Sequence, residues 1–202
     1  MIDIKSHPYW SQTNLFKPLH LLRIYLAREY AKIYPQDLFI AVTGSVGKTV
    51  CVQLCKAILS QKFTTITTKS NLNPILNIPQ TIFKLRPSVK KAVFEMGVDY
   101  PGEMDFYLSL IRPKTVILTK IFYAHNEFMG NIEQIAREKG KLLERLTQDC
   151  TAILNYDDLI IRKLAQNCKA QIVFFGVDQK NCDIWAGNIK IEDFKTTFEL
   201  NV

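Results

Sequence analysis

The chain has 202 residues, of which 48% are hydrophobic and 22% charged, values that fit one globular core and exclude a low-complexity or fibrous chain. Its net charge of +7 favours anionic partners, but its basic residues form no arginine-rich run, which argues against a nucleic-acid-binding protein. The five cysteines form no CxxC pair, and there is no signal peptide at the start and no apolar run of ~18 residues, so we expect a cytoplasmic protein with reduced thiols.

The first predicted element is an amphipathic helix over residues 14–33. The residues expected on its inward face are Leu15, Leu19, Leu22, Leu26 and Tyr30. We expect this helix to pack on the domain that follows it. Because basic residues accompany the apolar stripe, contact with a membrane surface or a partner is the alternative. Residues 1–37 are therefore predicted to form an N-terminal helical extension.

Beyond residue 37, short apolar strands alternate with amphipathic helices. Strands are predicted at 38–43, 64–68, 91–96, 114–121, 150–156 and 170–177. Helices are predicted at 49–60, 103–111, 131–146 and 157–167. The tail, residues 183–202, is predicted to form two strands around a turn. The pattern predicts a mainly parallel α/β sheet flanked by helices, with a terminal β-hairpin and ligands at the carboxyl ends of the strands.

A glycine-rich loop, TGSVGKT, joins strand 38–43 to helix 49–60. Gly44 and Gly47 let successive N–H groups point at phosphate oxygens, and the positive end of the helix points to the same place. Lys48 can reach terminal phosphates, and the Thr49 hydroxyl can bind Mg²⁺. Only two residues separate the glycines, whereas four separate them in the common phosphate-binding loop. The sequence therefore predicts a nucleotide site with an unusually short loop. In the helix that follows, the residues expected to face the sheet are Val50, Leu54, Ala57 and Ile58.

Three further side chains are candidates for the same site. Glu95 ends strand 91–96 and His125 lies just beyond strand 114–121, so both are expected to face the loop and to bind a metal. Lys139 falls on the apolar face of helix 131–146. The apolar residues of that face are Ile132, Ile135, Ala136, Leu142, Leu143 and Leu146. A buried lysine is costly unless it is paired or chemically changed; the alternative is a side chain that extends past its neighbours to water.

Taken together, these motifs resemble the Mur ligase family. In chain order they are T-G-S-V-G-K-T, F-E-M-G with P-G-E-M, A-H-x-E-F-M-G, I-A-x-x-K-G and L-N-Y-D-D. The short loop is typical of that family, and the resemblance runs from about residue 38 to the end. Within the family the chain most resembles the MurF type, which adds D-alanyl-D-alanine to a UDP-muramoyl tripeptide. Residues 69–85 resemble the Asn-rich stretch of that type.

The resemblance implies an ATP-dependent, amide-forming ligase of peptidoglycan precursor synthesis, which activates a substrate carboxylate as an acyl phosphate. It implies that the ATP phosphates are held by Thr43, Gly44, Ser45, Val46, Gly47, Lys48 and Thr49. One Mg²⁺ would be held by Thr49 and Glu95, and a second by His125. Lys139 would be carbamylated by CO₂ and support the second Mg²⁺, and Asn155 would contact adenine. Lys48, His125 and Lys139 would be the catalytic residues.

The chain also departs from the family pattern, with Thr119-Lys120 in place of Thr-Asn and Asn77 in place of a common glycine. We expect residues 38–202 to be the central ATP-binding domain, incomplete at its C-terminal end. The expected partners are an anionic substrate resembling a UDP-muramoyl peptide and a separate C-terminal ligase domain or subunit. The alternatives are a non-catalytic or truncated nucleotide-binding paralogue, and a sister ligase such as folylpolyglutamate or cyanophycin synthetase.

Overall fold

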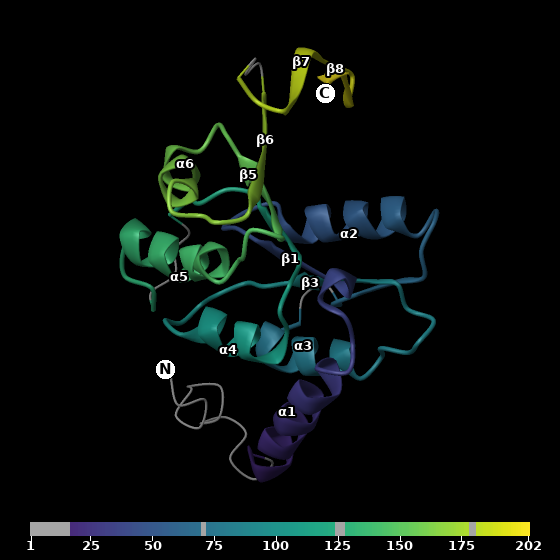
Figure 1. The fold of residues 1–202 in the computed structure, drawn as a ribbon. Helices are drawn as coiled ribbons and strands as arrows, with labels where there is room; N and C mark the ends of the chain where they lie inside the picture. The colour runs from purple at the N-terminus through teal and green to yellow at the C-terminus, as the bar shows by residue number, and fades with distance from the viewer. Residues whose placement is uncertain (1–16, 70–71, 124–127, 178–180) are drawn as a thin grey trace.

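The computed structural model describes residues 17–69, 72–123, 128–177 and 181–202. The strands in this part of the chain form one sheet, in the order β2-β3-β1-β4-β5-β6-β7-β8. Figure 1 shows the sheet with its flanking helices. The strands are β1 (Phe39–Thr43), β2 (Thr65–Thr67), β3 (Lys91–Glu95), β4 (Thr115–Leu118), β5 (Thr151–Asn155), β6 (Gln171–Val177), β7 (Ile184–Glu192) and β8 (Lys195–Asn201). Neighbouring strands are parallel from β2 through β7, whereas β7 and β8 are antiparallel. The predicted mainly parallel sheet with a terminal hairpin is confirmed.

The helices follow the predicted alternation, with one addition. They are α1 (Lys17–Ala31), α2 (Lys48–Leu59), α3 (Pro74–Ile82), α4 (Glu103–Leu110), α5 (Ile132–Glu144) and α6 (Leu159–Ala165), and a short 3₁₀ helix, η4 (Gln36–Leu38), precedes β1. Helix α3 was not predicted. Its start has the usual signals, because Asn73 caps it by accepting the N–H of Ile75 and Pro74 begins its first turn.

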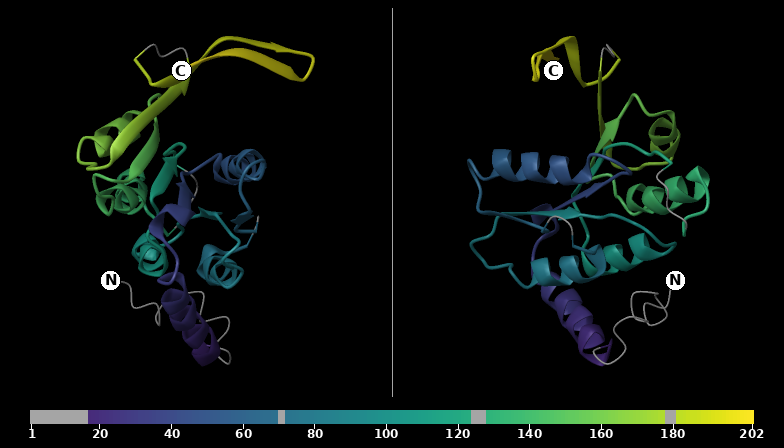
Figure 2. Two further views of the ribbon diagram at one scale, coloured as in Figure 1. Left: turned by 45° about the vertical axis from the view of Figure 1, so that its right-hand side comes forward. Right: turned by 180° about the vertical axis from the view of Figure 1, so that it is seen from behind.

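The helices cover both faces of the sheet. On β1, Ile40 and Val42 pack with Val52 of α2 on one face. Phe39 and Ala41 point the other way, into the larger core formed with α3, α4, α5 and α6. Figure 2 shows α2 on one side of the sheet and α3 and α4 on the other. Burial on both faces explains why every residue of β1 is buried.

Helix α1 packs against α3 and α4, as expected of a helix that lies on the following domain. The face predicted for this contact was largely wrong. Ala27 and Ala31 are buried there, and the Tyr30 hydroxyl donates to a backbone carbonyl at 2.9 Å. Instead, the leucines Leu19, Leu22 and Leu26 are exposed. The small side chains let the helices approach closely, and the leucine stripe therefore turns outward. Leu15 lies outside the described residues.

The predicted inward face of α2 was also wrong. Val50, Leu54, Ala57 and Ile58 are all exposed. The residues that pack against the sheet are Cys51, Val52, Cys55 and Leu59. Helix α2 carries apolar residues on both sides, so periodicity alone offers two equivalent faces. The loop before the helix decides between them, since it fixes where the first turn points.

The hairpin of β7 and β8 extends from the main body, as Figure 2 shows. Its turn contains Asp193 and Phe194, both with positive φ (41° and 65°), as in the tight turns that match strand twist. None of the described helices combines the length and apolar character needed to cross a bilayer.

Candidate functional site

The loop between β1 and α2 has a backbone that requires its two glycines. Gly44 has φ +148°, and a Cβ there would lie 2.0 Å from Oγ1 of Thr119, the residue after β4. Gly47 has φ +80° and caps α2 in the left-handed region. The loop is anchored to the neighbouring strand end, because the N–H of Ser45 donates to the Lys120 carbonyl at 2.6 Å. The geometry is that of a rigid turn leading into a helix N-terminus.

The first turn of α2 places a hydroxyl against a carboxylate. Oγ1 of Thr49 lies 3.0 Å from both carboxylate oxygens of Glu95, the last residue of β3. These two residues, 46 positions apart, meet because β1 and β3 are adjacent parallel strands that end at the same edge. The backbone N–H of Glu95 donates to Oγ1 of Thr68 at 2.9 Å, which helps to fix the end of β3. The pair offers three oxygen atoms at one point, which suits a hard cation.

Among the described residues there is no cluster of three or more His, Cys, Asp or Glu side chains that could hold a metal. A cation held by Thr49 and Glu95 could complete its coordination with phosphate oxygens and water. Mg²⁺ is bound in that way in many phosphate-transfer sites. The oxygen donors present fit such an ion, and the helix N-terminus beside them fits its phosphate partners.

Lys48 and Lys139 line the same cavity, of about 90 Å³, although they come from different helices. The other walls are Gly44 and Ser45 of the loop, Gly97, Val98 and Asp99 after β3, and Ile135. Nζ of Lys48 donates to the Ser45 carbonyl at 3.2 Å. The volume is below the ~300 Å³ at which small-molecule pockets begin, so the cavity suits one part of a ligand, such as a phosphate group.

Lys139 is buried as the sequence predicted, with 3% of its surface exposed. Within the described chain its ammonium makes no hydrogen bond or salt bridge. Burial, followed by the charge of Lys48, lowers the pKa of Lys139 to about 8. A lysine with this pKa has a substantial neutral fraction near neutral pH, which a nucleophilic amine needs.

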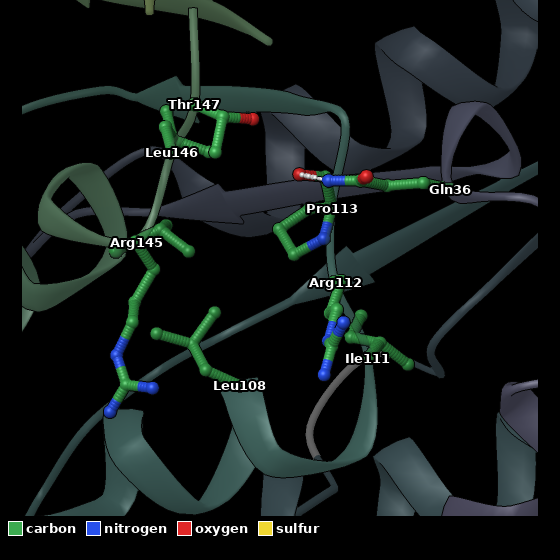
Figure 3. A pocket seen from close by; sticks show the side chains of 9 residues that line it. Gln36, Leu108, Ile111, Arg112, Pro113, Arg145, Leu146 and Thr147 are labelled. Atoms are coloured by element: carbon green, nitrogen blue, oxygen red, sulfur yellow. Dashed lines mark hydrogen bonds between the residues drawn. The ribbon is translucent and has the colours of Figure 1, made fainter. Parts of the chain in front are cut away.

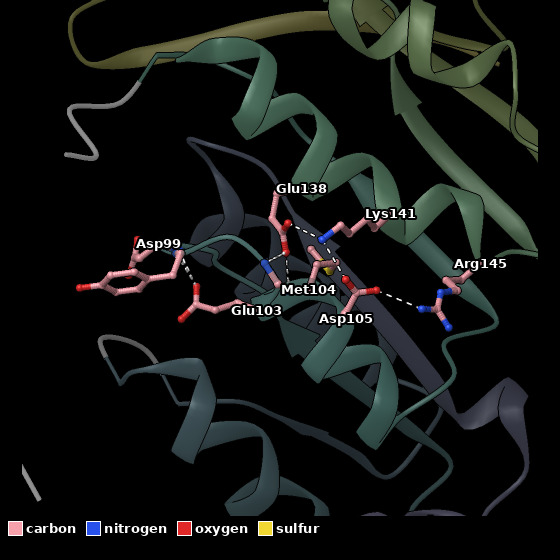
Figure 4. Close-up of polar contacts among 9 residues, drawn as sticks. Asp99, Glu103, Met104, Asp105, Glu138, Lys141 and Arg145 are labelled. Carbon is pink, nitrogen blue, oxygen red and sulfur yellow. Dashed lines mark hydrogen bonds and ion pairs between the residues drawn. The ribbon is translucent and has the colours of Figure 1, made fainter. Parts of the chain in front are cut away.

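Two buried carboxylates, Glu103 and Glu138, hold the turn that leads into α4 (Figure 4). Asp99 of this turn lines the same cavity as Lys139. Oε1 of Glu138, on α5, accepts the N–H groups of Gly102 at 2.8 Å and Met104 at 2.9 Å, at the start of α4. Glu103 accepts the N–H groups of Asp99 and Tyr100. Because this turn includes Asp99, α5 positions both Lys139 and the facing wall of the cavity. Burial raises the pKa of Glu103 to about 7.

The family model of the Mur ligase middle domain matches residues 42–202. The chain belongs to the Mur ligase family.

Individual relatives agree with this assignment. The UDP-N-acetylmuramoyl-tripeptide–D-alanyl-D-alanine ligase of Escherichia coli (strain K12) is 33% identical over 162 residues, which are 80% of this chain and 36% of that protein. MurF from Acinetobacter baumannii superposes with a TM-score of 0.82 at 27% identity, covering 90% of this chain and 40% of that one. MurF from Thermotoga maritima in complex with ADP has the same fold, with a TM-score of 0.79 at 24% identity over 90% of this chain and 42% of that one. This chain thus spans about a third of the length of the Escherichia coli ligase.

Within this Mur ligase domain, most of the predicted site residues lie together, Asn155 lies on a nearby strand, and one residue is outside the described part of the chain. The loop from Thr43 to Thr49, together with Glu95 and Lys139, converges on the edge formed by β1 and β3. Asn155 ends β5, two strands from β1, and donates to the Thr119 carbonyl at 2.7 Å. The loop and Asn155 therefore meet at the same residue, since the Thr119 hydroxyl donates to the Val46 carbonyl at 2.7 Å. His125 lies outside the described residues.

Some residues that shape this Mur ligase site were not predicted from the sequence. Glu138 could have been found, because it lies three residues from Ile135 and four from Leu142, on the apolar face that drew attention to Lys139. Thr119 was noted only as a departure from the family pattern, yet its hydroxyl is the atom that excludes a side chain at Gly44. Nothing in the sequence pattern indicated that contact, which joins the segments that follow two separate strands, β1 and β4.

Proposed function

We propose that this chain is the ATP-binding part of a MurF-like ligase, which forms an amide bond in peptidoglycan precursor synthesis. The observation that carries the proposal is the approach of the Thr49 hydroxyl to the Glu95 carboxylate, at 3.0 Å, beside the loop of Lys48. The similarity to D-alanyl-D-alanine ligases and to a MurF solved with ADP supports it.

In this proposal the chain binds the phosphates of ATP at the N-terminus of α2. Backbone N–H groups of residues 43–49 would donate to phosphate oxygens, and Lys48 would leave the Ser45 carbonyl to pair with the terminal phosphate. Thr49 and Glu95 would hold one Mg²⁺, and His125 would hold a second. Bound Mg²⁺ would neutralise charge on the phosphates during transfer.

The reaction proposed has two steps. A carboxylate oxygen of the substrate attacks the γ-phosphorus of ATP, the bond to the β-phosphate oxygen breaks, and an acyl phosphate and ADP form. An amine then attacks the acyl carbon and forms the C–N bond, phosphate leaves with the electrons of the C–O bond, and the nitrogen releases a proton to the solvent. Lys48 would favour the first step, since its charge faces the oxygens on which negative charge accumulates. The basic chain would attract an anionic substrate resembling a UDP-muramoyl peptide.

Lys139 is proposed to act as a carbamate. Its neutral amine attacks the carbon of CO₂, an N–C bond forms and the nitrogen releases a proton, which leaves a carbamate anion. The lowered pKa of about 8 provides the neutral amine. The product would replace a buried cation beside Lys48 with an anion, so the two side chains would attract rather than repel. Asn155 is proposed to contact adenine.

The domain arrangement is also a proposal. Residues 1–37 would form an extension and 38–202 the ATP-binding domain, in a cytoplasmic protein. Because the chain covers 36% of the Escherichia coli ligase, we propose that a further domain or subunit holds the incoming amine.

The loop assignment is tested by calorimetry of ATP binding with Mg²⁺. We expect Lys48→Ala to weaken binding by about 2 kcal/mol or more, because a charge-assisted contact to phosphate is lost. The matched control is Lys56→Ala, an exposed lysine on the same helix, which should bind ATP normally. Equal affinity of the native chain and Lys48→Ala would refute the assignment of the phosphate site.

The carbamate is tested by ¹³C NMR with labelled bicarbonate. The native chain should give a carbamate signal that Lys139→Ala lacks, whereas the exposed Lys163→Ala should retain it. In an assembly with the amine-binding part, Lys139→Ala should also lower ATP turnover, and added bicarbonate should not restore it. A short carboxylic acid should restore part of the turnover by filling the vacated anion position. A signal that persists in Lys139→Ala would rule out this lysine as its source.

A further inference from the structure

Two adjoining cavities lie at the opposite end of the sheet from the Lys48 loop. The first has a volume of about 310 Å³ and lies between α4 and α5 (Figure 3). The second has a volume of about 360 Å³ and lies between α1 and α4. Both are lined by Gln36, Ile111 and Arg112. These residues precede β1 and β4, so the two cavities form one groove at the amino ends of the strands, here called the amino-end groove.

The rim of the amino-end groove is basic. Arg28 of α1, Arg112 and Arg145 all line it, and no Asp or Glu is among its described lining residues. Nε of Arg28 donates to the Ser109 carbonyl at 2.9 Å, which fixes the orientation of its guanidinium. Arg145 pairs with Asp105 at 3.0 Å. Arg112 is exposed and makes no hydrogen bond or ion pair with any described residue. Arg28 and Arg112 therefore have guanidinium N–H groups available to a carboxylate ligand.

The floor of the first cavity is aliphatic. Between Arg112 and Arg145 it is formed by Leu108, Pro113 and Leu146, as Figure 3 shows. Cavities of this size hold small molecules or a few side chains of a peptide. A ligand that fills the groove must therefore present negative charge at its rim and an apolar group at its floor.

We propose that the amino-end groove binds an acidic peptide segment of a partner protein. Its carboxylates would pair with Arg28 and Arg112, whose planar guanidinium groups match the two oxygens of a carboxylate. One apolar side chain of the segment would occupy the floor between α4 and α5. Charge complementarity selects this partner, since the chain carries a net charge of +7. Single-stranded nucleic acid fits less well, because it stacks on exposed aromatic platforms. The floor of the first cavity is aliphatic, and of the two aromatic residues in the second cavity Phe39 is buried and Tyr34 is half-buried.

The position of the groove separates it from the proposed ATP site. The loop of Lys48 follows β1, whereas Gln36 precedes it, so the length of the strand lies between them. Arg28 also precedes residues 42–202, the part matched to the Mur ligase middle domain. The inference does not depend on the proposed ligase reaction.

The test uses the full chain and a short fluorescein-labelled peptide in which glutamates flank one leucine. Fluorescence anisotropy should show binding, and Arg28→Glu/Arg112→Glu should weaken it about tenfold or more, because charge-assisted contacts become repulsive. The control is Lys84→Glu/Lys163→Glu, which changes the net charge equally at exposed positions outside the groove. It should bind within about twofold of the native chain. Thermal unfolding confirms that each variant is folded.

Further measurements distinguish an acidic peptide with an apolar side chain from other ligands of the groove. A peptide of glutamates alone should bind about tenfold more weakly, because it places no side chain on the floor. Lys48→Ala should bind the peptide normally, even if it no longer binds ATP. The proposal is overturned if the peptide does not bind, if the lysine control loses as much affinity as the arginine variant, or if glutamates alone bind equally well. Displacement by a single-stranded oligonucleotide at lower concentration than by unlabelled peptide would assign the groove to nucleic acid instead.

Discussion

Helices α5 and α2 differ in which side chains they bury: α5 buries charged residues, whereas α2 exposes apolar ones. On α5, Glu138 and Lys139 are buried, with exposed fractions of 4% and 3%. On α2, Val50, Leu54 and Ile58 are exposed by 64%, 57% and 70%. Hydrophobicity would predict the reverse. Both helices flank the same site, so the comparison shows what decides burial there.

The difference lies in which contacts each helix must make. The first turn of α2 is fixed by the approach of Thr49 to Glu95, and Lys48, Val52, Cys55 and Leu59 follow on that side at four- and three-residue spacing. The other apolar side is left in water. On α5, the backbone N–H groups at the start of α4 need an acceptor, and Glu138 supplies it. Burial in this region thus follows hydrogen-bonding needs and loop geometry more closely than hydropathy.

The substitution with the largest expected effect on stability removes the buried carboxylate of α5. Glu138→Ala should lower the free energy of unfolding by about 4 kcal/mol, because buried N–H groups of Gly102 and Met104 lose their acceptor. The melting temperature should fall by about 8–16 °C, measured by circular dichroism. The control Glu144→Ala, an exposed carboxylate on the same helix, should change stability by less than about 0.5 kcal/mol. If both substitutions had the same small effect, Glu138 would not brace α4.

A second test uses pH to measure the free-energy cost of burying the ionised carboxylate of Glu103 in the turn before α4. The folded pKa of Glu103 is about 7, above its ordinary value of 4.5, so the folded state binds the proton more tightly than the unfolded state. The native chain should therefore lose stability relative to Glu103→Gln as pH rises from 4.5 to 7, by up to about 3 kcal/mol. Urea unfolding of both proteins across this range measures the difference. A difference that stayed constant with pH would show that Glu103 titrates normally.

The smallest effects are expected on the two sides of α2. Val52→Ala should destabilise the chain by about 2 kcal/mol, since Val52 is 1% exposed and packs from α2 against β1. Ile58→Gln, although more drastic in chemistry, should change stability by less than about 0.5 kcal/mol. Urea unfolding of the two variants compares the faces directly. A larger loss in Ile58→Gln than in Val52→Ala would mean that the exposed face is covered in solution.

Much of the fold and part of the candidate site could be predicted from local sequence. The alternation of apolar strands and helices predicts a parallel sheet, because strands buried on both faces must be apolar throughout. The TGSVGKT loop predicts a phosphate site, since its two glycines adopt backbone conformations that other residues rarely reach. Lys139 could be placed on a buried face, because its three- and four-residue spacing from apolar residues of the same helix is visible in the sequence. Each of these inferences depends on residues that are close along the chain.

Other features were decided only by tertiary structure. Periodicity does not choose between the two apolar sides of α2; the contact between Thr49 and Glu95, 46 residues apart, does. The outward turn of the α1 leucines depends on how closely Ala27 and Ala31 approach the domain. The role of Glu138 requires the unpaired N–H groups of another helix. These outcomes depend on which strands and helices become neighbours in space, and a one-dimensional pattern contains that information only indirectly.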